Sequence, residues 1–204
     1  MSDRSFVRFG GLAGILLAIT SWAAVAVYYT LARGGKDLIG VEIFQLLYAL
    51  IAFWALFGIV AVHWVVRPHG EAWSFFAVLV GVLASAATIA SSLYPIAFTR
   101  DYLRQPIDPA LPLPSAVSPT DPLNVMTFGL TGLWFVIANL LLWRAPVSRR
   151  LVALGFVASA DLFVGFVAAL GAQGSVVMLA AVVAGAVGGP LYWLWLGVTL
   201  RRLA

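Results

Sequence analysis

Six apolar stretches, each long enough to cross a membrane, constrain this chain more than any other feature. We place them at residues 7–31, 41–66, 73–98, 123–143, 151–170 and 175–200. At about 1.5 Å per residue, roughly 20 residues of α-helix cross the hydrocarbon core of a bilayer. The stretches are apolar all round and lack the alternation of membrane β-strands. The sequence therefore predicts an all-α membrane protein, a bundle of six transmembrane helices.

The sequence outside these stretches is too short to build a separate soluble domain. Of the 204 residues, 63% are hydrophobic and 10% are charged, which is far from the balance of soluble domains. We expect residues 1–204 to form one integral membrane domain with the lipid bilayer as its main partner. The net charge of +4 does not indicate a nucleic-acid partner, because the basic residues lie singly or in pairs at the ends of the apolar stretches.

The distribution of arginine and lysine predicts the orientation. With the N-terminus in the cytoplasm, eight basic residues lie inside and four outside. The inside residues are Arg4, Arg8, Arg67, Arg144, Arg149, Arg150, Arg201 and Arg202, and the outside residues are Arg33, Lys36, Arg100 and Arg104. Because cytoplasmic loops carry the excess of these residues, we expect both termini to be cytoplasmic.

Residues 99–121 form the one substantial polar segment, between the third and fourth helices. Its five prolines, at positions 106, 109, 112, 114 and 119, predict a long, extended external loop. The loop could be a lid, a partner contact or a spacer. Asp121 followed by Pro122 predicts an N-cap and the first helical residue of the fourth helix. Within the third helix, Pro95 predicts a kink or a loosened turn.

Asp161 is the only carboxylate near the middle of an apolar stretch. An ionisable group at bilayer depth is a candidate functional site, although a structural hydrogen bond is the alternative. Steps of three and four residues place Asp161 in one stripe with Ala158, Gly165 and Ala168. Small residues let helices approach closely, so we expect Asp161 to face helix 175–200 and not lipid.

Helix 175–200 has a matching stripe of small residues at Ala181, Gly185 and Gly189. Pro190 has no N–H to offer the carbonyl of Ala186. Our hypothesis is that protonated Asp161 donates a hydrogen bond to this region of helix 175–200, since polar groups in hydrocarbon need a partner. Asp161→Asn should then be tolerated, and Asp161→Leu should destabilise the bundle.

Other polar and small residues in the stretches are interpreted first as packing contacts. Asn139 predicts an interhelical hydrogen bond, and Ser85 and Thr88 can close gaps in helix packing or serve as polar partners in a proton relay with Asp161. Gly10 and Gly14 form a G-x-x-x-G step that indicates a close helix contact, within the chain or in a dimer.

The chemistry of common active sites is missing from the sequence. There are no cysteines and only two histidines, His63 and His69, which excludes thiolate catalysis, iron–sulfur centres and a histidine-rich metal site within the chain. We expect both histidines to lie at the surface or among lipid headgroups. We predict no enzyme activity and no cofactor.

Three motifs carry a resemblance to a known family. They are Arg8-Phe-Gly-Gly-Leu-Ala-Gly14, the arginine-flanked turn before Leu151-Val-Ala-Leu-Gly155, and Gly188-Gly-Pro-Leu-Tyr-Trp-Leu-Trp-Leu-Gly197 with Arg201-Arg202. They resemble small six-helix bacterial membrane proteins that are grouped as a family of unknown function. The resemblance implies a six-span bundle in a bacterial cytoplasmic membrane, and it supplies no catalytic residues.

Two functions fit these features. The first is a non-enzymatic multipass membrane protein, an accessory or scaffold subunit that contacts other membrane subunits or further copies of itself. The alternative is a small transporter or proton-coupled carrier that uses Asp161. A water-accessible cavity that touches Asp161 would favour transport, and dry packing against helix 175–200 would favour a scaffold.

Overall fold

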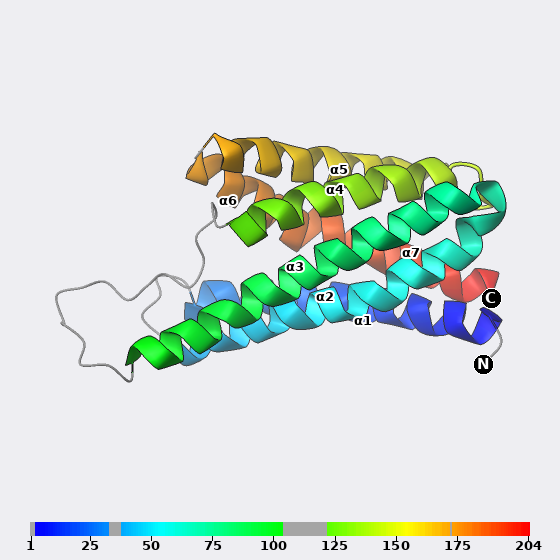
Figure 1. The fold of residues 1–204 in the computed structure, drawn as a ribbon. Helices are drawn as coiled ribbons and strands as arrows, with labels where there is room; N and C mark the ends of the chain where they lie inside the picture. The colour runs from blue at the N-terminus through cyan, green and yellow to red at the C-terminus, as the bar shows by residue number, and fades with distance from the viewer. Residues whose placement is uncertain (1–2, 33–37, 104–121, 172) are drawn as a thin grey trace.

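The computed structural model describes residues 3–32, 38–103, 122–171 and 173–204. These residues are helical apart from short turns and contain no strand. Six of the helices are long and apolar enough to cross a membrane. The prediction of an all-α chain with six membrane-length helices is therefore confirmed (Figure 1).

The helices have the following bounds. Helix α1 (Asp3–Val27) continues into a π-helical turn, η1 (Tyr28–Ala32). Helix α2 (Leu38–Val66) is joined through the 3₁₀ turn η2 (Arg67–His69) to α3 (Glu71–Leu103), and α4 (Pro122–Leu142) precedes α5 (Arg149–Leu170). The sixth span consists of α6 (Gly174–Val183), a π-helical segment η3 (Ala184–Gly188) and α7 (Gly189–Leu203).

Helix α3 differs from its predicted form. It continues through Pro95 as α-helix to Leu103, so the first residues of the predicted 99–121 loop are helical, and residues 104–121 lie outside the described part. Helix α4 begins at Pro122 as predicted, whereas its predicted N-cap, Asp121, is not among the described residues.

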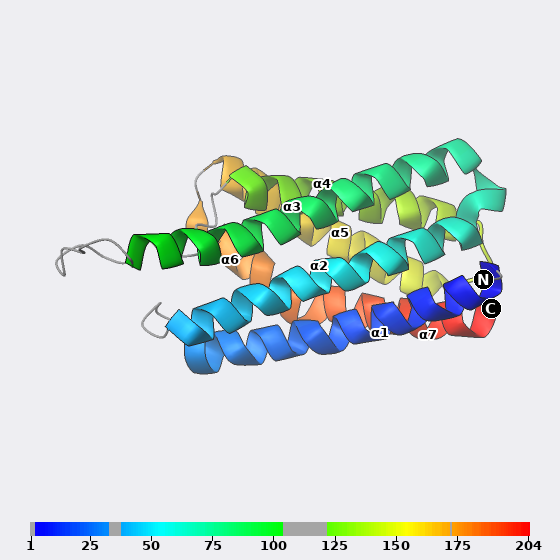
Figure 2. The ribbon, with the colours of Figure 1, turned by 60° about the horizontal axis from the view of Figure 1, so that its bottom comes forward.

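Successive spans are antiparallel neighbours, and the α7 part of the sixth span closes the bundle by packing on α1. Both termini lie at the same end of the bundle, on the right in Figures 1 and 2; we call this the terminal end. A short turn joins α4 to α5 at the terminal end. There the Arg149 guanidinium contacts the carbonyl of Trp143 and lies 4.4 Å from the centroid of its ring.

The sixth span has two different neighbours. Its α6 part packs on α5, as predicted, but its α7 part packs mainly on α1. Glycines permit this second contact, because a Cβ on Gly197 would lie 2.5 Å from the carbonyl oxygen of Gly11. A Cβ on Gly14 would lie 3.1 Å from the carbonyl oxygen of Trp193. Helix α5 is therefore the leading neighbour of only half of the span.

Candidate functional site

A cavity of about 220 Å³ lies in the centre of the bundle and is lined by residues from all six spans. Many of its lining residues are alanine or glycine, whose small side chains leave space between the helices. These small residues are Ala52, Ala55, Gly81, Ala84, Ala158, Ala181, Ala184, Gly185 and Gly189. The small stripe predicted on the sixth span thus faces the cavity, and the span meets α5 through Ala180 and Gly188 instead.

Stacked aromatic rings form one wall of the cavity. The rings of Trp134 and Trp193 are nearly parallel, at 6° and with centroids 5.2 Å apart, and both line the cavity. Glycines on α2 and α3 make room for them: a Cβ on Gly58 would lie 2.5 Å from Trp193, and one on Gly81 would lie 2.8 Å from Trp134. The pair therefore lies packed between α2, α3, α4 and α7.

Hydroxyl groups supply the polar part of the lining. The described lining residues include Ser21, Tyr48, Ser85, Thr88, Thr127 and Thr131, and no charged residue. Ser21, Thr88 and Thr127 each donate to a carbonyl one turn earlier in their own helix. Their oxygens keep lone pairs that can accept a further hydrogen bond. The predicted candidates Ser85 and Thr88 thus lie together in the cavity wall.

Asp161 does not belong to this cavity lining. It lies on α5 between two contacts with the sixth span, where Ala158 faces Gly188 and Gly165 faces Ala180. Its Oδ2 is buried and has no hydrogen-bond partner among the described residues. The carboxyl group therefore lies at the predicted level of the sixth span, but apart from the cavity-lining candidates Ser85 and Thr88.

The donor to the Ala186 carbonyl is Trp22, and the predicted hydrogen bond from Asp161 to this region of the sixth span is not found among the described residues. Trp22 Nε1 lies 3.0 Å from the carbonyl oxygen of Ala186. The carbonyl lies within the π-helical segment just before Pro190, where a turn with one extra residue accommodates the proline ring. The freed carbonyl was thus predicted correctly, and its partner comes from α1.

Asn139 forms an interhelical hydrogen bond at the terminal side of the aromatic wall. It is fully buried and accepts from the Tyr192 hydroxyl at 3.3 Å while its Nδ2 donates to the carbonyl of Phe135 at 2.8 Å. Its amide lies against Gly155, where even a Cβ would overlap it. Asn139 therefore ties α4 to α7 at a crossing with α5, outside the cavity lining.

The other predicted packing glycines face separate partners. Gly10 faces Ala61 on α2, and Gly14 faces Gly197 on α7, so the two glycines of the G-x-x-x-G step bring α1 close to two helices of the same chain. Gly165 lies between Phe128 on α4 and Ala180 on α6. These glycines therefore fix helix spacing around the cavity.

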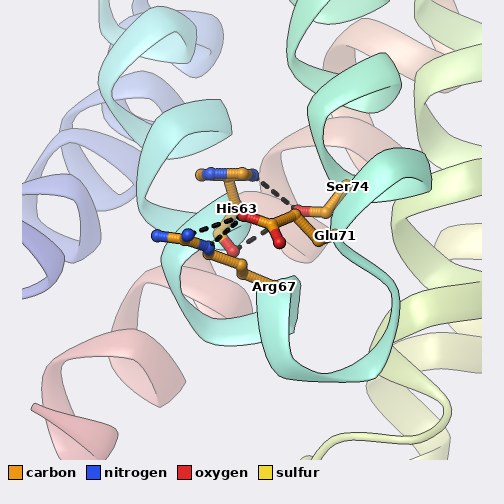
Figure 3. Close-up of polar contacts among 4 residues, drawn as sticks. All are labelled: His63, Arg67, Glu71 and Ser74. Atoms are coloured by element: carbon orange, nitrogen blue, oxygen red, sulfur yellow. Dashed lines mark hydrogen bonds and ion pairs between the residues drawn. The ribbon is translucent and has the colours of Figure 1, made fainter.

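A polar cluster joins α2 to α3 at the terminal end (Figure 3). His63 Nδ1 and Ser74 Oγ are 2.6 Å apart, and Arg67 pairs with Glu71 at 2.6 Å. Within the described part of the chain, no three His, Asp or Glu side chains lie close enough together to hold a metal ion. We interpret this cluster as a brace for the α2–α3 turn, since its four residues bond mainly to one another.

Sequence reasoning missed Trp22, Tyr48 and the stacked tryptophans. The position of Trp22 could have marked it as a functional or structural residue. Tryptophan is typical of the membrane–water interface, whereas Trp22 lies well inside its span. No such signal existed for the stacked pair, whose residues are far apart in the chain. Comparisons with protein-family models, curated proteins and solved structures find no match to this chain.

Proposed function

We propose that this chain is a non-enzymatic multipass protein that binds a small, neutral, lipophilic molecule in the centre of its bundle. The observation that carries the proposal is the cavity of about 220 Å³ lined from all six spans. Ligand sites in helix bundles typically lie between the helices and combine apolar walls with a few polar groups. The proposed setting is a bacterial cytoplasmic membrane, with one domain and both termini in the cytoplasm.

Cavity size limits the ligand. An engineered cavity of about 150 Å³ holds one benzene molecule, so this somewhat larger cavity suits a ligand on the order of ten non-hydrogen atoms. Its aromatic wall of Trp134 and Trp193 favours an apolar or ring-containing body. The acceptor oxygens of Ser21, Thr88 and Thr127 favour a hydroxyl or other donor on the ligand.

Charge further restricts the ligand class. A charged ligand would lose its hydration without gaining an ionic partner, because the described lining residues carry no charge. Asp161 is not among them, so this geometry supports binding without proton coupling better than a carrier that uses Asp161. A role as an accessory subunit remains compatible with ligand binding, and the family resemblance remains a prediction.

Photolabelling tests the proposal directly. We would reconstitute the full chain in vesicles, add a diazirine derivative of octanol, irradiate, and map the labelled residues by mass spectrometry. We expect labels on the cavity lining, above all at Trp134 and Trp193. Gly185→Leu should reduce this labelling at least tenfold, because position 185 faces the cavity with only Tyr48 Oη nearby.

Ala160→Leu provides the matched control. Position 160 is exposed on the outer face of α5, so a leucine there adds a similar side chain without filling the cavity, and labelling should persist. Labels confined to lipid-facing residues in the unmodified protein, or equal cavity labelling in Gly185→Leu and Ala160→Leu, would contradict the proposal.

A further inference from the structure

The distance between α1 and the sixth span grows from the terminal end towards the opposite end. Near the terminal end, Gly11 and Gly197 bring the two backbones into contact. Halfway along, the Trp22–Ala186 hydrogen bond connects them. Beyond this bond, the main helix contact of α6 is with α5, and both ribbon views show α6 beside α5 and away from α1 (Figures 1 and 2).

The cavity lies where these helices separate. Val25 on α1 and Tyr48 on α2 line it from one side, and Ala181 on α6 and Gly185 on η3 line it from the other. Outer residues of α6, such as Leu179 and Val183, are exposed. Within the described residues, α1 and α6 make no substantial contact with each other. We therefore expect a molecule dissolved in the bilayer to reach the cavity wall between α1 and α6 without crossing a packed helix interface.

The junction between α6 and α7 is suited to movement. The π-helical segment η3 replaces the regular hydrogen-bond ladder over Ala184–Gly188, and Pro190 removes one more donor. Glycines at positions 185, 188 and 189 lower the cost of changing the backbone dihedrals. The Trp22 bond holds this junction against α1, so α6 can tilt while α7 stays packed.

We propose that the cavity opens sideways to the bilayer between α1 and α6, and that its ligand is a molecule dissolved in the bilayer. The segment η3 is the hinge for this opening, and the Trp22–Ala186 bond is its fixed point. The inference rests on the proposed function, and it adds the route and the source of the ligand.

A cleavable cross-link tests the route. The chain has no cysteine, so the double variant Val25→Cys/Ala181→Cys offers two thiols, one on each side of the opening. A bis-maleimide with an internal disulfide would join α1 to α6 in the folded, reconstituted protein. The readout is the rate at which the diazirine derivative of octanol, supplied in the vesicle lipid, labels Trp134 and Trp193.

We expect cross-linking to slow labelling of the cavity at least tenfold, and reductive cleavage of the linker to restore it. The cleaved protein keeps both half-linkers on its cysteines, so it controls for the modification itself. A rate that stays reduced after cleavage would overturn the hinge, because freeing α6 from α1 would then not restore entry to the cavity. Failure of the link to form would show that residues 25 and 181 do not face each other across the opening, and would contradict the proposed route.

The two proposals fail differently in this experiment. If cross-linked protein is labelled in the cavity as fast as the unlinked variant, the sideways route is wrong while binding stands, and the ligand reaches the cavity from the end opposite the termini. If neither the double variant nor the unmodified protein is labelled in the cavity, the proposed function fails and the route fails with it.

Discussion

Removing the indole N–H of Trp22 should weaken the bundle by a measurable amount. Trp22→Phe keeps an aromatic ring but removes the donor that lies 3.0 Å from the Ala186 carbonyl. In the proposed bilayer setting, lipid offers this carbonyl no replacement donor. Interhelical hydrogen bonds in membranes contribute about 0.6 kcal/mol on average and up to about 2 kcal/mol. We expect a loss of about 1–2 kcal/mol, near the upper end, because a backbone acceptor is left unpaired.

The same carbonyl can be given a different donor. Pro190→Ala restores a backbone N–H one turn after Ala186, which allows the helix to satisfy the carbonyl internally. In that background, Trp22→Phe should cost no more than about 0.5 kcal/mol. The double-mutant cycle should therefore show a coupling energy of about 1 kcal/mol, with the packing losses of the single substitutions removed.

Reversible unfolding in mixed detergent micelles, followed by circular dichroism, measures these free energies. Trp195→Phe is the matched control, because Trp195 is 39% exposed and Trp22 is 38% exposed. The control should lose less than about 0.5 kcal/mol, which is typical of a surface substitution. If Trp22→Phe and Trp195→Phe lose equal stability, or if the cycle shows no coupling, the hydrogen bond does not stabilise the proline break.

Two further predictions concern other contacts of the fold. Asp161→Leu should be at least as stable as the unmodified protein in the same unfolding assay, because it removes a buried oxygen that lacks a partner. Such an unsatisfied group costs roughly 1–3 kcal/mol. A clear loss of stability would instead support the structural hydrogen bond predicted for Asp161. Gly197→Ala should lose about 1–3 kcal/mol through overpacking, because its Cβ would meet the Gly11 carbonyl at 2.5 Å. Gly185→Ala is the paired control, since its Cβ would meet only Tyr48 Oη at 3.5 Å, and equal losses at positions 185 and 197 would contradict the packing account.

Hydrophobicity alone predicted the helical spans because hydrocarbon leaves the backbone almost no alternative to a helix. The local rule for proline was less decisive. Pro95 and Pro190 both remove a backbone donor, yet α3 continues as α-helix through Pro95, whereas the sixth span forms a π-helical segment before Pro190. The rule identified Ala186 as a carbonyl without its usual donor in the helix. It could not identify the actual donor, Trp22, which is 164 residues away in the chain.

The cavity could not be predicted for a related reason. Its walls depend on which small residues face each other across six helices. A sequence pattern shows only that small residues share one face of a helix, and not which helix they face. Asp161, the most conspicuous residue in the sequence, lies outside the described lining, whereas less conspicuous hydroxyls such as Thr88 and Thr127 lie within it. Polarity at bilayer depth therefore marked several candidates, and tertiary packing decided which of them share a site.

Small residues on the sixth span permit a close helix contact at one position and leave a cavity at another. The proposed hinge at η3 lies between the two positions. At Gly197 the span approaches α1 until the backbones touch, so the missing side chain permits a close contact. At Gly185 the span has already turned towards α5, no backbone from α1 or α2 fills the position, and the missing side chain leaves part of the cavity. The change occurs across η3, between a helix half fixed by glycine contacts and one that packs on α5. The proline break, beside which Trp22 bonds to Ala186, thus separates a small residue that forms an interface from small residues that line the cavity.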